Sequence, residues 1–123
     1  MAAATITLSE TLTLVGTSAT TTVQVSQSIT QTDGVPNTCA DQVIGTTTES
    51  ITFGDVTSPG YMAIKNTDAT NFVLIGLSTP VTALNAVAHL KAGEGMLIPT
   101  RQATWYALAD TASVTISKQI LSL

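Results

Sequence analysis

Polar and apolar residues alternate with a period of two along residues 5–14 of this sequence. Ile6, Leu8, Leu12 and Leu14 take one side of an extended chain, and threonine and serine residues fill most positions between them. Alternate residues of a strand point to opposite faces of a sheet, whereas a helix repeats about every 3.6 residues. The segment is therefore predicted to be a half-buried β-strand.

The same alternation, together with the turn-forming residues Gly, Pro, Asn and Asp between apolar segments, predicts further strands along the chain. Residues 16–19 are expected to form the turn after the first strand. The further strands are expected at 20–29, 43–44, 50–53, 61–64, 72–77, 82–90, 96–98, 104–108 and 113–121. Residues 82–90 also fit one face of a short helix, and we favour the strand.

Eight to ten short strands at this spacing predict an all-β, antiparallel β-sandwich or jelly-roll-like barrel. We expect one domain over residues 1–123, because no linker or repeat interrupts the chain. Threonine supports this fold class: it makes up roughly a fifth of the chain, and β-branched side chains favour strands.

Charged residues are scarce, at 10% of the chain against about 25% in a typical soluble domain. A surface of threonine, serine, alanine and valine is easier to desolvate than one of lysine and glutamate. We therefore expect neighbouring subunits to cover much of it. The alternative is a threonine-coated monomer.

The few charges also bear on the class of partner. The net charge is −4, and the basic residues Lys65, Lys91, Arg101 and Lys118 are spread over the second half. Nucleic acid is not expected as a partner, because binding it needs clustered Lys and Arg. The sequence also shows neither a secretory signal pattern nor an apolar run long enough for a membrane helix, so no membrane partner is expected.

The residue types needed for catalysis are almost absent. His89 and Cys39 are the single histidine and the single cysteine, so a nucleophile–base pair has one candidate base and a zinc site has too few ligands. The Gly93-Glu94-Gly95 stretch lacks the residues of a phosphate-binding loop and is predicted to be a turn. We expect a protein that is not an enzyme and has no catalytic residues, metal site or cofactor.

A carboxylate pair of the glycosidase kind stays open at this point, because residues distant in sequence could meet in space. The acids concerned are Glu10, Glu49, Asp55, Glu94 and Asp110.

Aromatic residues and one loop supply the candidate interface. Trp105 and Tyr106 are adjacent, so they should point to opposite faces of their strand, one ring into the core and the other outward. Together with Tyr61 they are candidate interface anchors, since Trp and Tyr are common at interface hot spots. Residues 30–41 read as a long surface loop. Asp33 and Asn37 from this loop complete the candidate interface.

The connection Lys65–Asn71 is the clearest turn signal in the chain. Asn66, Asp68 and Asn71 are of the types that stabilise turns by hydrogen bonding to the local backbone. We predict that they join 61–64 and 72–77 into a hairpin, and that Gly93 forms another structural turn.

The stretch Ser58–Gly76, with its glycine, apolar strand, Asn-x-Asp-x-Thr-Asn, aromatic and valine-rich strand, resembles small structural proteins of tailed bacteriophages. The similarity continues through Leu90-Lys91-Ala92-Gly93-Glu94, Leu97-Ile98-Pro99 and Tyr106-Ala107. It covers roughly the second half of the chain, and its motifs are turn-and-strand signatures of a jelly-roll-like module.

The resemblance implies a virion component made in the host cytoplasm. The leading expectation is a capsid decoration, or cement, protein that sits as a homotrimer on the outer capsid surface and bridges major capsid subunits. The N-terminal strand is then expected to be exchanged with, or packed on, a neighbouring subunit. Two alternatives are a tail or fibre-associated structural module and a carbohydrate-binding sandwich that uses Trp105, Tyr106 and Tyr61.

Overall fold

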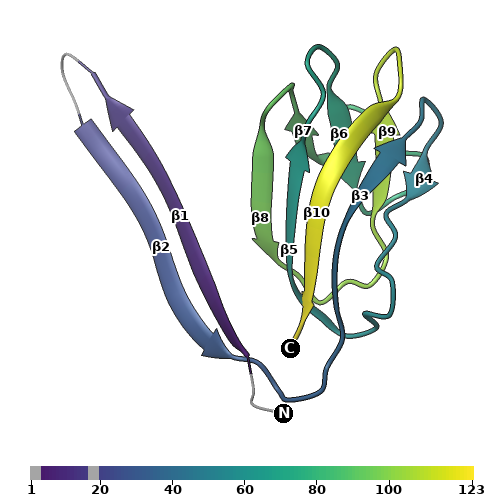
Figure 1. Cartoon of the computed structure of the whole chain (residues 1–123). Coiled ribbons are helices and arrows are strands. Elements are labelled where there is room, and N and C mark those ends of the chain that lie inside the picture. The colour runs from purple at the N-terminus through teal and green to yellow at the C-terminus, as the bar shows by residue number, and fades with distance from the viewer. Residues whose placement is uncertain (1–3, 17–19) are drawn as a thin grey trace. The chain divides into compact units, whose positions relative to one another are not determined.

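The computed structural model describes residues 4–16 and 20–123 of the 123-residue chain. In these residues the regular elements are ten β-strands (Figure 1): β1 (Thr5–Val15), β2 (Thr20–Thr30), β3 (Asn37–Ile44), β4 (Glu49–Ser50), β5 (Pro59–Asn66), β6 (Val73–Gly76), β7 (Ala86–Leu90), β8 (Gly95–Pro99), β9 (Tyr106–Ala109) and β10 (Val114–Ser122). Within that part of the chain, no helix is long and apolar enough to cross a membrane.

The chain divides into two compact units, with the boundary between Val35 and Pro36. In the first unit, β1 and β2 form a two-stranded antiparallel sheet of their own. The strands expected at 5–14 and 20–29 are therefore present. They belong to this sheet, whereas the predicted single domain placed them in the sandwich. The turn expected at 16–19 falls largely on residues 17–19, which lie outside the described residues.

The second unit is a sandwich of two four-stranded antiparallel sheets. One has the strand order β3-β10-β5-β8 and is called the β10 sheet here, and the other, the β6 sheet, has the order β4-β9-β6-β7. Figure 1 shows the two sheets as facing layers. Eight strands in two such sheets are the arrangement of a jelly roll. The predicted fold class, an antiparallel all-β sandwich, is confirmed.

The core lies between the two sheets. In β10, Val114, Ile116 and Ile120 are fully buried, as the period-two alternation predicts. Ile44 and Met62 lie beside them in the same sheet, and Ile75 of the β6 sheet and Trp105 belong to the same core cluster. Burial of these large side chains is the main stabilising contribution to a unit of this size.

The hairpin predicted across residues 61–77 is wrong. β5 pairs with β10 and β8, whereas β6 pairs with β7 and β9. The Asn-rich connection therefore carries the chain from the β10 sheet to the β6 sheet. The turn residues were predicted correctly as a turn, but turn chemistry does not specify whether the next strand joins the same sheet or the opposite one.

The predicted long loop at 30–41 is also shorter than expected. β3 begins at Asn37, and its eight residues pair with β10 from Asn37 opposite Leu121 to Ile44 opposite Val114. β3 is the edge strand of the β10 sheet and is mostly exposed. Backbone pairing rather than apolar burial holds it, so the apolar pattern used to find strands was missing there.

The strand favoured at 82–90 is present only in its second half, as β7. Before it, Thr82 and Asn85 form a reciprocal pair: the Thr82 amide donates to Asn85 Oδ1 at 2.8 Å, and the Asn85 amide donates to Thr82 Oγ1 at 3.3 Å. Such a box of side-chain bonds stabilises a tight turn. Residues 82–85 therefore form a turn that leads into β7.

Candidate functional site

The two-stranded sheet of the first unit, called the ribbon here, has two chemically different faces. Because residues opposite each other in an antiparallel pair share a face, the register places Leu12 with Val23 and Ile6 with Ile29. Glu10 and Val25 form another pair on this apolar face.

The opposite face of the ribbon carries hydroxyl and amide groups. There Thr7 pairs with Ser28, Ser9 with Ser26, Thr11 with Gln24 and Thr13 with Thr22. The hydroxyl oxygens of Thr13 and Thr22 lie 3.4 Å apart, within hydrogen-bond distance. This hydroxyl face suits contact with water. The ribbon is therefore amphipathic, with one polar face and one apolar face.

The apolar face is open in the half that holds Leu12 and Val23, whereas Ile6 and Leu8, toward the start of β1, are buried. Leu12 is 76% exposed, Val23 is 63% exposed and Val25 is 48% exposed. Together with Glu10 and Thr11 these residues line a hollow of about 310 Å³. A two-stranded sheet by itself is at best marginally stable in water, so this exposed apolar face is the strongest sign of a binding surface in the described residues.

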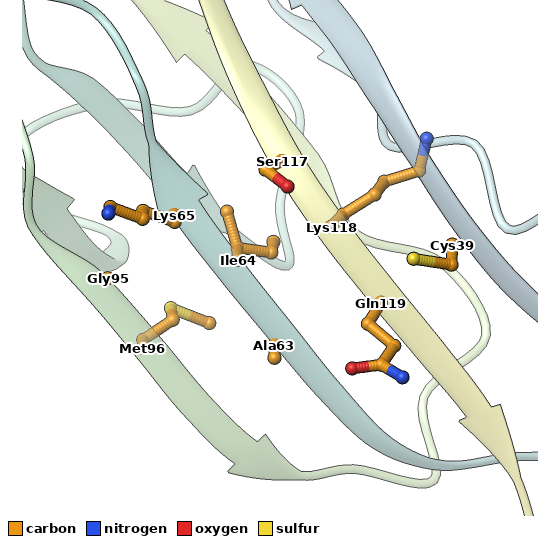
Figure 2. Close-up of a pocket in the computed structure, with 9 residues that line it drawn as sticks. All are labelled: Cys39, Ala63, Ile64, Lys65, Gly95, Met96, Ser117, Lys118 and Gln119. Atoms are coloured by element: carbon orange, nitrogen blue, oxygen red, sulfur yellow. The ribbon is translucent and has the colours of Figure 1, made fainter.

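The outer face of the β10 sheet carries a second hollow, of about 320 Å³ (Figure 2). Small residues line part of it: Ala63 on β5 and Cys39 on β3 flank Gln119 on β10. In the next row Gly95 lies beside Lys65, followed by Ser117. Small side chains over three neighbouring strands leave a shallow, level depression.

The charges on this outer face lie in one row. Lys65 on β5 and Asp41 on β3 both flank Ser117, and both side chains are exposed. Two strand spacings of about 4.8 Å separate them. The β5 side of the face is therefore positive and its β3 edge is negative.

Lys118 lies on the other side of the β10 sheet, in the inward series with Ile116 and Ile120. Only 4% of its surface is exposed. Burial lowers the pKa of Lys118, and the Asp41 carboxylate acts against that shift. The predicted alternation of β10 is thus followed even where it places a charged residue inward.

We expect Lys118→Met to raise the free energy of unfolding by about 1 kcal/mol at pH 7, because it keeps the apolar stem and removes a poorly solvated charge. The folded-state pKa lies below the ordinary value of 10.5, so the unfolded chain binds more protons between these two values. Wild-type stability therefore rises with pH through that window, and the advantage of the variant shrinks. Urea unfolding at pH 7 and pH 10.5 measures both effects. The exposed Lys91→Met is the control, and a less stable Lys118→Met protein would contradict the prediction.

The predicted turn residues Asn66, Asp68, Asn71 and Gly93 come together at one end of the sandwich. Asn66 is fully buried, and its side-chain amide donates to the carbonyl oxygens of Asn71 and Leu90, both at 2.9 Å. Its Oδ1 accepts from the Asp68 amide at 2.8 Å. The Gly93 amide donates to the Asn66 carbonyl at 3.0 Å, and the φ of +81° at Gly93 explains the glycine. Asn66 therefore ties together two turns that are distant in sequence.

Asp68 closes the first of these turns. Its Oδ2 accepts from the Asn71 amide at 2.7 Å and from the Thr70 amide at 3.0 Å, and these bonds, the one from Asn71 first, lower the pKa of Asp68.

Because the folded-state pKa of Asp68 lies below its ordinary value of 3.8, its contribution to stability is present above pH 3.8 and is lost as the pH falls through the lowered value. We expect Asp68→Asn to be less stable than wild type at pH 6, and we expect the difference to narrow toward pH 2.5. Urea midpoints over this range measure it. Asp55→Asn, in another turn, is the control, and a difference that stays constant with pH would contradict the assignment.

The three aromatic interface candidates differ in exposure. Trp105 is 2% exposed, belongs to the core and donates its indole N–H to Thr100 Oγ1 at 3.3 Å. Tyr61 is also buried, with the Arg101 guanidinium 5.8 Å from its ring centre. Only Tyr106 is partly exposed. Trp105 thus fills the space between the sheets, and these three rings do not form an exposed aromatic platform.

The two loop candidates belong to different units of the chain. Asp33 is exposed in a turn of the first unit, beside Gly34 with its φ of +78°. Asn37 is the first residue of β3, and its Oδ1 accepts from the Ser122 amide at 3.2 Å. Asn37 therefore helps to hold the end of β10, and it shares a cross-strand row with Leu121 and the buried candidate Tyr61.

The residues considered for chemistry are engaged locally or dispersed. His89 is exposed on β7 with its ring centre 4.2 Å from that of Phe72, and Cys39 is exposed on β3. Glu49 accepts from the Gly45 amide at 3.0 Å, and Glu94 accepts from the Lys91 amide at 3.2 Å. Over residues 4–16 and 20–123, no three His, Cys, Asp or Glu side chains cluster as a metal site would require.

Comparison with protein-family models, curated proteins and solved structures finds no match to this chain. The two surfaces that stand out, the apolar face of the ribbon and the outer face of the β10 sheet, were not among the predicted site residues. The alternation over residues 5–14 pointed to the first surface. The second depends on small residues that only the strand register brings together.

Proposed function

We propose that this chain is a structural protein of a bacteriophage virion, a capsid decoration protein that binds the outer capsid surface and stabilises the shell by bridging neighbouring major capsid subunits. The observation that carries the proposal is the ribbon, a separate element on whose apolar face Leu12, Val23 and Val25 are exposed, in a chain whose sandwich unit has its own core. Such an element gains stability by covering that face, as an assembly contact would do.

The composition supports the same role. With 10% charged residues, association removes few charges from water, and the desolvation cost that opposes burial of a charged surface is small. The phage-like motifs named above add the virion as the setting. The same features also fit a tail or fibre module, and location and copy number separate the two roles.

Mass spectrometry and quantitative gels of purified particles test the proposal. A decoration protein should be present in hundreds of copies and should be labelled over the head by immunogold. A few copies at the tail would overturn the decoration role in favour of the tail module, and absence from particles would overturn the virion role altogether.

A binding assay on capsid shells that lack the protein tests the part played by the ribbon. The double variant Leu12→Ser, Val23→Ser alters the apolar face and should lower shell binding by at least about tenfold. The matched control Thr13→Ser, Thr22→Ser alters the hydroxyl face and should bind like wild type. Equal binding of both variants would show that shell binding does not depend on the apolar face.

A further inference from the structure

The partner of the ribbon can be argued from three features: its own instability, the position of its single charge and the form of the β10 sheet. The instability of the ribbon requires a partner that covers it. In the described part of the chain, neither outer edge of the ribbon is paired, and Leu12, Val23 and Val25 on its apolar face are exposed. Another sheet face, lying about 10 Å away as in sandwiches, would cover it.

Glu10 is the charged residue of the ribbon strands. It lies at the midpoint of β1, on the apolar face beside Val25. If two ribbons packed face to face about a twofold axis through their centres, the two Glu10 carboxylates would meet in an apolar contact. Like charges there would oppose ionisation of both groups. The favoured cover therefore carries a positive charge opposite Glu10.

The outer face of the β10 sheet meets this description. Ala63, Gly95, Ser117 and Cys39 line its hollow of about 320 Å³ and leave room for the exposed side chains of Leu12 and Val23, and Lys65 stands at its border (Figure 2).

We infer that the apolar face of the ribbon packs on the outer face of the β10 sheet of a second copy of this chain, with Glu10 beside Lys65. The inference rests on the proposed role of the ribbon as an assembly element and names its partner. Each copy carries both surfaces, so the contact is head-to-tail, and a closed ring such as a trimer satisfies every ribbon and every sheet. Asp41, at the β3 edge of the same face, disfavours the placement of Glu10 on that side.

Charge reversal on the full-length chain tests the contact, with multi-angle light scattering and sedimentation as readouts. Glu10→Lys and Lys65→Glu should each weaken self-association by about tenfold or more, and the double variant should recover most of it. Lys91→Glu, which makes the same charge change at an exposed site outside this face, should associate like wild type. All altered side chains are exposed, and circular dichroism checks that each variant is folded.

Mixing the two single variants shows whether the contact joins separate copies. In a mixed pair, the lysine introduced at position 10 of one copy meets the glutamate introduced at position 65 of the other. The second contact, from the ribbon of the other copy, joins the natural Glu10 to the natural Lys65. In an alternating assembly every contact is then favourable, and in a mixed trimer two of the three contacts are, so the mixture should associate more tightly than either variant alone. Recovery in the double variant without recovery in the mixture would show that the ribbon folds onto its own sandwich, which overturns the inference.

The inference is also overturned by a monomeric wild-type protein at high concentration, or by a double variant no tighter than the single ones. These outcomes are separate from the proposed function. A monomer present in hundreds of copies on phage heads would remove the ribbon contact and leave the decoration role, whereas a rescued oligomer absent from particles would do the reverse.

Discussion

Replacing Trp105 with alanine is expected to lower the free energy of unfolding of the sandwich by about 4 kcal/mol, the range found when large aromatic residues are removed from cores. The side chain is 2% exposed and belongs to the cluster between the two sheets. Its loss leaves a cavity and removes the hydrogen bond to Thr100. Urea unfolding followed by circular dichroism measures the change, because the tryptophan signal itself is lost.

The neighbouring residue provides the matched control. Tyr106 is only partly buried, so Tyr106→Ala should cost less than half as much. If Trp105→Ala kept wild-type stability, the core position of Trp105 would be wrong. The pair also separates structural from binding effects: glycan binding abolished by Tyr106→Ala in a protein that stays folded would support a carbohydrate site, whereas loss on Trp105→Ala alone would follow from unfolding.

Asn66→Ala is expected to lower the free energy of unfolding by about 3 kcal/mol. The substitution removes three side-chain hydrogen bonds. It leaves the carbonyl groups of Asn71 and Leu90 without these donors and the Asp68 amide without its acceptor. Each buried polar group left without a partner costs about 1 kcal/mol or more. Thermal and urea unfolding measure the effect.

Two variants show whether the side-chain amide of Asn66 is responsible. Asn66→Asp keeps an oxygen for the Asp68 amide but places a carboxylate against the two carbonyl groups, so it should be at least as harmful as alanine. Asn71→Ala removes only an exposed bond from the Thr111 hydroxyl and should cost about 1 kcal/mol or less. Equal losses for Asn66→Ala and Asn71→Ala would contradict the special role of Asn66.

The alternation in the sequence predicted the strands well where one face of the strand is buried. It located β1, β2 and β10, and it placed Lys118 among inward residues despite its charge. It found only residues 43–44 of β3, because an edge strand held by backbone pairing needs no apolar pattern. It also failed to pair β5 and β6 correctly, because partners of a strand are set by the whole sandwich and not by the adjacent turn.

The candidate site was less accessible to prediction. Aromatic type alone suggested Trp105 and Tyr61 as surface anchors, yet large rings are also the most effective core residues, and here the core holds Trp105. The hollow on the β10 sheet comes from Ala63, Ser117 and Gly95. These small residues are distant in sequence, and only the strand register shows that they lie close together. The apolar series of β1 was visible from the start, but the separation of the ribbon from the sandwich was not.

The central place of β10 has a consequence for the order of synthesis. β10 lies between β3 and β5 and is the last strand in the sequence, so a nascent chain that has emerged only as far as β9 holds a sheet with its middle missing. The ribbon, in contrast, has all its strands outside the ribosome once Thr30 has emerged. The ribbon is therefore translated long before the sandwich can close, and chaperone occupancy on stalled chains would be highest between those two points.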